Sequence, residues 1–148
     1  MMFLTHLSFA LFLGLLIIKN AFIPVDYYTF LAIILLGSLL PDIDCATSLI
    51  GRKFKLLNFF FEHRGFFHTI VLMIIITILV FLITKNYYYS LAIILGFSSH
   101  LFLDGFTLKG ITPFWPSKLR FKGIFKTGRL FDLILFVGFV VLDVFLLL

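Results

Sequence analysis

The sequence predicts an all-α polytopic membrane protein, a bundle of about five transmembrane helices that forms one domain over residues 1–148. Of its 148 residues, 62% are hydrophobic and only 13% are charged, and the mean hydropathy is +1.19. A soluble domain carries about 25% charged and about 45–50% apolar residues. The excess of apolar residues therefore argues against a water-soluble enzyme, a disordered tail and a nucleic-acid partner, although the net charge is +5. Because Cys45 is the single cysteine, an intrachain disulfide and a Cys-based zinc ribbon are excluded.

Five apolar runs, separated by short polar breaks, are the candidate spans. They cover residues 3–18, 27–40, 66–84, 87–106 and 130–148. A helix that crosses the hydrocarbon core needs about 20 residues, and at least about 17. The last three runs satisfy this length, whereas the first two are short unless flanking residues join them. No Lys or Arg precedes Leu11 and no Ala-x-Ala site follows, so we expect a retained helix rather than a cleaved signal peptide.

The Lys and Arg residues predict the orientation of these spans. Ten of the twelve lie in the loops 41–65 and 107–129, and the other two loops hold only Lys19 and Lys85. Loops enriched in Lys and Arg remain in the cytoplasm. We therefore expect a plasma (inner) membrane protein with its N-terminus inside and its C-terminus outside. Aromatic and basic residues alternate in the loop 107–129, which fits either a loop on the membrane surface or an ordinary positive-inside loop.

Seven histidines and aspartates, from four segments far apart in the sequence, are predicted to meet at the cytoplasmic face. They are His6, Asp42, Asp44, His63, His68, His100 and Asp104. Ionisable residues at membrane depth are costly and are usually functional. Imidazoles and carboxylates without thiolates suit Zn²⁺, and also Mn²⁺ or Fe²⁺. The sequence therefore predicts a site for a divalent metal ion, with Zn²⁺ as the first candidate.

The local spacing agrees with a shared site. His100 and Asp104 are four residues apart and share one helix face. Pro41 is expected to end the second helix, which frees the two following carboxylates to turn toward a common point. His63 and His68 are five residues apart, so His63 is expected in the approach loop and His68 on the first turn of the third span.

Other interpretations of the single polar residues are open. His6 alone is most often a hydrogen-bonded contact between helices. Asp132 fits either a structural pair with Arg129 or an outer-shell partner of the metal site. The sequence indicates no role for Asp143 or Cys45.

The polar motifs resemble those of a known family. Thr5-His6, the segment Gly37–Asp44, the segment His63–Thr69 and His100-Leu101-Phe102-Leu103-Asp104 occur in the order found in the YdjM family. That family is described as LexA-binding inner-membrane proteins and metal-dependent hydrolases. The same set is more distantly similar to zinc-dependent phospholipase C and S1/P1 nucleases. Those enzymes carry a later histidine set that is missing after His100, so the resemblance implies one or two metal ions rather than three.

Together these features predict a membrane-embedded metal-dependent hydrolase. We expect a phosphoesterase that acts on a phospholipid, an isoprenoid phosphate or another amphiphilic phosphoester at the cytoplasmic surface through metal-activated water. Asp44 is expected to orient or deprotonate the water and Arg64 to bind the phosphate. Further phosphate contacts are expected from Arg52, Lys118 and Arg120. The alternatives are a non-catalytic, metal-stabilised membrane scaffold and a metal-transport protein, and the oligomeric state is open.

Overall fold

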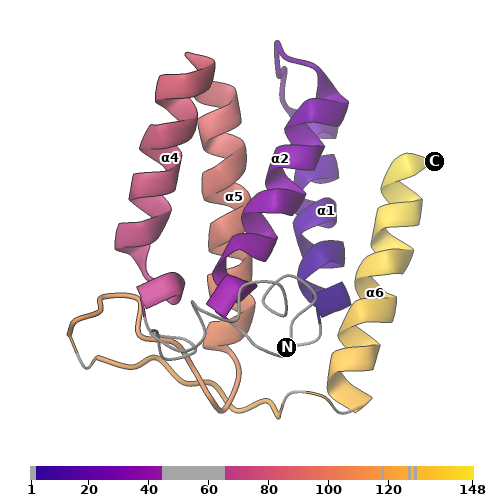
Figure 1. The fold of residues 1–148 in the computed structure, drawn as a ribbon. Coiled ribbons are helices and arrows are strands. Elements are labelled where there is room, and N and C mark those ends of the chain that lie inside the picture. Colours follow the sequence, from indigo (N-terminus) through magenta and orange to yellow (C-terminus); the bar gives the residue numbers. More distant parts are fainter. Residues whose placement is uncertain (1–2, 45–65, 118, 127, 129) are drawn as a thin grey trace.

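The computed structural model describes residues 3–44, 66–117, 119–126, 128 and 130–148. Over these ranges the chain forms five α-helices and two 3₁₀ helices and contains no β-strand, which confirms the all-α class (Figure 1). The elements are α1 (Phe3–Asn20), α2 (Tyr27–Leu39), η1 (Leu40–Asp44), η3 (Phe66–His68), α4 (Ile70–Thr84), α5 (Tyr87–Gly105) and α6 (Leu130–Leu147).

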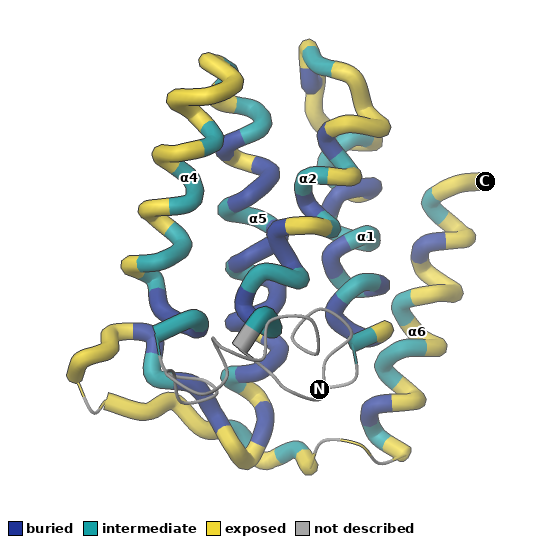
Figure 2. The backbone as a smooth tube through the Cα atoms, viewed as in Figure 1, coloured by how far each residue is buried: buried dark blue, intermediate teal, exposed yellow. Residues whose placement is uncertain are grey.

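Helix α5 lies at the centre of the bundle. It packs against α1, α2 and α4, while α6 packs against α1 on the outside. Burial follows this arrangement, because α4 and α6 are largely exposed and the buried positions gather in α1, α2 and α5 (Figure 2). Phe30 and Ile34 of α2, Ala10 of α1 and Ala92 of α5 form an apolar core. The polar buried residues lie mainly toward the opposite end of the bundle from the α4–α5 connection.

Within the described residues, two helices, α1 and α6, are long and apolar enough to cross a membrane by length and composition. Each has 18 residues, which corresponds to about 27 Å. The sequence predicted the first span to end at residue 18, but α1 continues through Lys19 to Asn20, whose side-chain amide donates to the Leu16 carbonyl at 2.8 Å. The first run is therefore longer than expected.

The prediction of one continuous helix over residues 66–84 is wrong. The Thr69 backbone is extended, with φ −110° and ψ 150°, and its hydroxyl accepts the Leu72 N–H at 3.1 Å. A threonine in this role starts a new helix, so α4 has only 15 residues and extends about 22 Å. Helix α5 has 19 residues, but its serines, histidine and aspartate make it too polar to be counted with α1 and α6.

The loop between α5 and α6 is held by backbone hydrogen bonds. Ile111 and Phe121 exchange two N–H···O bonds of 2.9 Å each, and the Gly123 N–H donates to the Thr107 carbonyl at 3.0 Å. The Ile70 N–H donates to the Pro113 carbonyl at 3.0 Å. These bonds fix the loop against the start of α4.

Helices α2 and α5 approach each other backbone to backbone at two glycines. A Cβ atom on Gly37 would lie 3.4 Å from the Gly96 Cα. A Cβ atom on Gly96 would lie 2.0 Å from the Ile34 carbonyl oxygen and 2.9 Å from the Ser38 nitrogen. Only glycine therefore permits this crossing.

Replacing Gly96 tests the crossing directly. We expect Gly96→Ala to force α2 and α5 apart and to lower the free energy of unfolding by about 1–3 kcal/mol, as overpacking does. Thermal unfolding in detergent measures the change. Gly138→Ala is the matched control, because nothing lies within 4 Å of that Cβ position, and it should leave the midpoint unchanged or slightly raised. Equal midpoints for Gly96→Ala and wild type would contradict the close contact.

Candidate metal centre

Five of the seven predicted ligands come together in the described part of the chain. They are His6 from α1, Asp42 from η1, His68 from η3, and His100 and Asp104 from α5. The segments that carry them meet at one end of the bundle (Figure 1). Helix α5 contributes two of them because His100 and Asp104 are separated by one turn near its C-terminal end.

The Asp104 carboxylate is the point on which the three imidazoles converge. Its Oδ1 lies 3.5 Å from His6 Nε2, and its Oδ2 lies 3.6 Å from His68 Nε2 and 3.9 Å from His100 Nε2. His100 Nε2 also lies 3.7 Å from Asp42 Oδ1. Two overlapping groups of possible ligands result, His6–His100–Asp104 and Asp42–His68–His100, each with its ligand atoms within 4.8 Å of one another.

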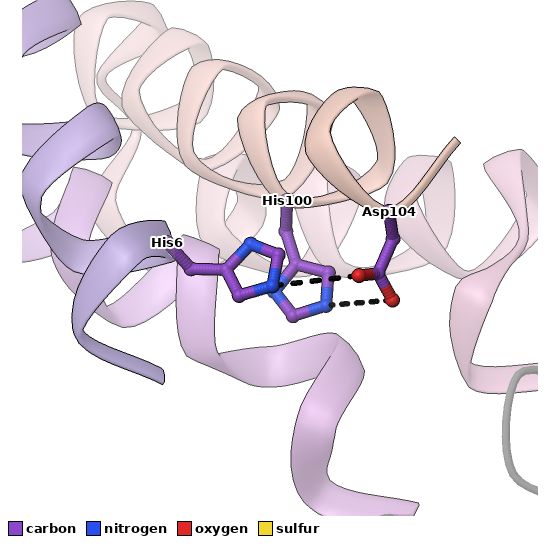
Figure 3. Close-up of side chains that lie close together, drawn as sticks. All are labelled: His6, His100 and Asp104. Carbon is purple, nitrogen blue, oxygen red and sulfur yellow. Dashed lines mark ion pairs between the residues drawn. The ribbon is translucent and has the colours of Figure 1, made fainter. Parts of the chain in front are cut away.

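The histidine rings are packed closely around this carboxylate. His6 and His100 stack with centroids 3.9 Å apart and planes 10° apart, and both point an Nε2 atom toward Asp104 (Figure 3). His68 meets His100 edge to face at 5.3 Å. The four side chains are at most 2% exposed, whereas Asp42 is 17% exposed. Asp42 is therefore the most accessible member of the cluster.

A backbone carbonyl sets the tautomer of His100. His100 Nδ1 lies 2.7 Å from the Ser38 carbonyl oxygen. Because a carbonyl only accepts, Nδ1 carries the proton and the neutral ring presents an unprotonated Nε2 to the cluster. The contact follows from the helix crossing, since Ser38 adjoins Gly37 and His100 lies one turn after Gly96. The sequence analysis missed Ser38, and its position beside a glycine one turn before Asp42 was the available signal.

The remaining predicted residues are not placed at the cluster. His63, Arg64, Arg52 and Lys118 lie outside the described residues. The backbone of Asp44 belongs to η1, but its side chain is also outside the description. Arg120 lies exposed in the loop after α5. The roles assigned to these residues stay predictions.

The fold and the cluster define a class: a helical protein whose described part contains two helices of membrane-spanning length and a buried histidine–aspartate site. The comparisons place the chain within it. The YdjM inner membrane protein family matches residues 1–147, so the chain belongs to this family of inner-membrane proteins. That confirms the family predicted from the motifs, while the likeness to phospholipase C and S1/P1 nucleases stays a prediction.

Two relatives show how far the similarity extends. The uncharacterized protein YvsG of Bacillus subtilis (strain 168) is 36% identical over 112 residues, which cover 69% of this chain and 68% of the relative. The inner membrane protein YdjM of Escherichia coli (strain K12) is 28% identical over 106 residues, covering 66% of this chain and 54% of the relative. The chain thus spans about half the length of the latter protein. No solved structure matches.

The tautomer of His100 is testable without any ligand. We expect nitrogen NMR of the protein in micelles, with ¹⁵N-labelled histidine, to show Nδ1 protonated and Nε2 unprotonated for His100 at neutral pH. His100→Asn assigns the resonance by its disappearance. A neutral His100 protonated at Nε2 instead would contradict the hydrogen bond to the Ser38 carbonyl.

Proposed function

We propose that this protein is a membrane-embedded metal-dependent hydrolase, a phosphoesterase that acts on a lipid or another amphiphilic phosphoester at the cytoplasmic membrane surface. The observation that carries the proposal is the convergence of three buried imidazole nitrogens on one buried carboxylate. Family membership supports the membrane location. The distances and residue types in the cluster support the binding of a divalent metal ion.

The separations within the cluster are slightly longer than those between ligand atoms around a bound ion. Direct N–H···O hydrogen bonds are about 2.7–3.2 Å long, and the four nitrogen–oxygen distances here are 3.5–3.9 Å. Zinc binds histidine and carboxylate at about 2.0–2.2 Å in tetrahedral geometry, which puts neighbouring ligand atoms about 3.3–3.6 Å apart. A small contraction of the cluster therefore suits Zn²⁺.

The shared histidine favours one ion. Both groups of possible ligands contain His100, and its Nδ1 is engaged by the Ser38 carbonyl. Only Nε2 is left for a metal, and one imidazole nitrogen binds one ion. We propose a principal ion held by His6, His68, His100 and Asp104, with Asp42 at its accessible side.

In the proposed hydrolysis, different residues of the chain have different roles. A divalent ion held by these residues would supply Lewis acidity and would lower the pKa of its bound water to about 7. In the proposed reaction the water oxygen bonds to phosphorus, the ester P–O bond breaks, and the proton released by the water ends on the leaving oxygen. We propose that Asp42, the most accessible member of the cluster, orients that water. From their positions in the sequence we assign Asp44 as the general base and Arg64 as the phosphate ligand.

An apolar cavity at the same end of the bundle as the cluster, lined by none of the cluster residues, is the feature from which we propose an amphiphilic substrate. It has a volume of about 570 Å³ and lies between α4, α5 and the loop that follows α5, a size typical of ligand sites. Its lining includes Ile70, two residues after His68, and Gly105, which adjoins Asp104. Among the described lining residues Lys122 is the only charged one. We propose that a hydrocarbon chain of the substrate occupies this cavity, with an anionic group of the substrate near Lys122.

Metal content and hydrolysis test the proposal together. We expect the protein purified in detergent to bind about one Zn²⁺ per chain and to hydrolyse a phospholipid or phosphodiester, and a chelator to abolish hydrolysis. His100→Ala should weaken Zn²⁺ binding by more than the roughly 10–100-fold typical of outer-shell changes. Asp143→Asn, a buried carboxylate on α6 outside the cluster, is the control and should retain both properties.

The outcomes separate the alternatives. Stoichiometric metal without hydrolysis of any phosphoester tested would favour the metal-stabilised scaffold. Absence of bound metal would overturn the site itself.

The proposed orientation has its own test. Five spans with the N-terminus inside put Leu148 outside and the cluster toward the cytoplasm. A periplasm-active reporter fused after Leu148 should therefore be active, and a fluorescent protein that matures only in the cytoplasm should stay dark at the same position. The reverse pattern would mean that the number of spans is not five or that the bundle is inverted, and it would remove the argument that the cluster faces the cytoplasm.

A further inference from the structure

Asp132 is a buried carboxylate that the proposed ligand set does not use. It lies in the first turn of α6 and is 0% exposed. Its Oδ2 accepts the Gly128 N–H at 2.6 Å, which caps the helix. Its Oδ1 is buried and has no hydrogen-bond partner among the described residues. A helix cap explains one oxygen of this carboxylate and leaves the other unexplained.

His6 has the complementary unsatisfied group. Its Nε2 points toward Asp104 at 3.5 Å, so a metal ion would take that atom and Nδ1 would carry the proton. His6 Nδ1 is buried and has no hydrogen-bond partner among the described residues. A buried N–H without an acceptor costs about 1–3 kcal/mol. The metal-loaded form therefore needs an acceptor near His6.

The α1–α6 contact brings together the backbone segments that carry these two groups. The hydroxyl of Thr5, the residue before His6, lies 3.4 Å from the Asp132 carbonyl oxygen. Residues 5 and 132 are both 0% exposed, and His6 is 2% exposed. A buried acceptor on α6 thus adjoins the backbone that carries a buried donor on α1.

We propose that Asp132 is the positioning residue of the metal centre: its Oδ1 accepts the Nδ1 proton of His6, directly or through one water, when His6 Nε2 binds the ion. This inference rests on the proposed metal site. Metal-binding histidines typically donate their other ring N–H to a carboxylate or carbonyl, which orients the ring and raises its basicity. Ser38 fills that role for His100, and Asp132 would fill it for His6.

Asp132→Asn separates this role from helix capping. The asparagine oxygen can still accept the Gly128 N–H, but the second position becomes an NH₂ donor that cannot accept the His6 proton. We expect the thermal midpoint of the metal-free protein to stay near that of the wild type. We expect Zn²⁺ affinity, measured by competition with a chromophoric chelator, to fall about 10–100-fold.

The Co²⁺-loaded protein provides a second readout. A changed geometry at His6 should alter the ligand-field absorption spectrum of Co²⁺ in Asp132→Asn. Asp143→Asn is the matched control, because it makes the same substitution at another buried carboxylate of α6. It should retain the wild-type affinity and spectrum.

The outcomes distinguish failure of the positioning role from failure of the proposed metal site. Wild-type Zn²⁺ affinity and an unchanged Co²⁺ spectrum in Asp132→Asn would overturn the positioning role and leave the metal site standing. A lowered thermal midpoint with unchanged affinity would show a purely structural role and would also overturn it. A wild-type protein that binds neither ion would overturn the proposed metal site and this inference with it.

Discussion

The close crossing of α2 and α5 is the constraint on which the rest of the structure depends. Because Gly37 and Gly96 have no side chains, the two backbones meet within van der Waals distance. That contact brings the Ser38 carbonyl to His100 Nδ1 and directs Nε2 into the cluster. In membranes, where lipid weakens the hydrophobic drive for helix association, small residues that allow close packing are the usual means of joining helices. This crossing thus both packs the two helices together and orients the His100 ring.

The cluster buries several polar groups in an apolar bundle, which lowers the stability of the fold. Buried polar groups are costly unless they are satisfied, and the described hydrogen bonds leave His6 Nδ1 and His100 Nε2 without a partner. The stack of His6 on His100 and the approach of three rings to Asp104 concentrate this cost at one point. A bound divalent ion would offset it, so metal binding and folding would be coupled. A change at the site would therefore also change the stability of the bundle.

The short elements around the cluster matter as much as the long helices. Thr69 stops η3 from merging with α4, and this break leaves His68 on a separate turn directed at the cluster. The loop after α5 is tied to Ile70 through Pro113, and the cavity forms between them. A continuous third helix would be long enough to cross the bilayer, but it would place His68 on a regular helix face. The chain thus combines a shortened α4 with a candidate ligand, His68, that lies outside the regular helix.

The all-helical class and the family could be read from the sequence, because apolar runs, the scarcity of charge and the spacing of polar motifs are local properties. The i, i+4 spacing alone predicts that His100 and Asp104 share a face. Helix ends were less predictable, since the Thr69 cap and the extension to Asn20 depend on local hydrogen bonds that hydropathy does not record.

Only the tertiary structure decided how the polar residues meet. The Ser38 carbonyl became an orienting group through the Gly37–Gly96 crossing, and Asp132 came beside the start of α1 across 127 residues of sequence. Local patterns determine which residues are available to a site. Distances between elements decide which of them face one another, because those distances are set by packing among all the helices.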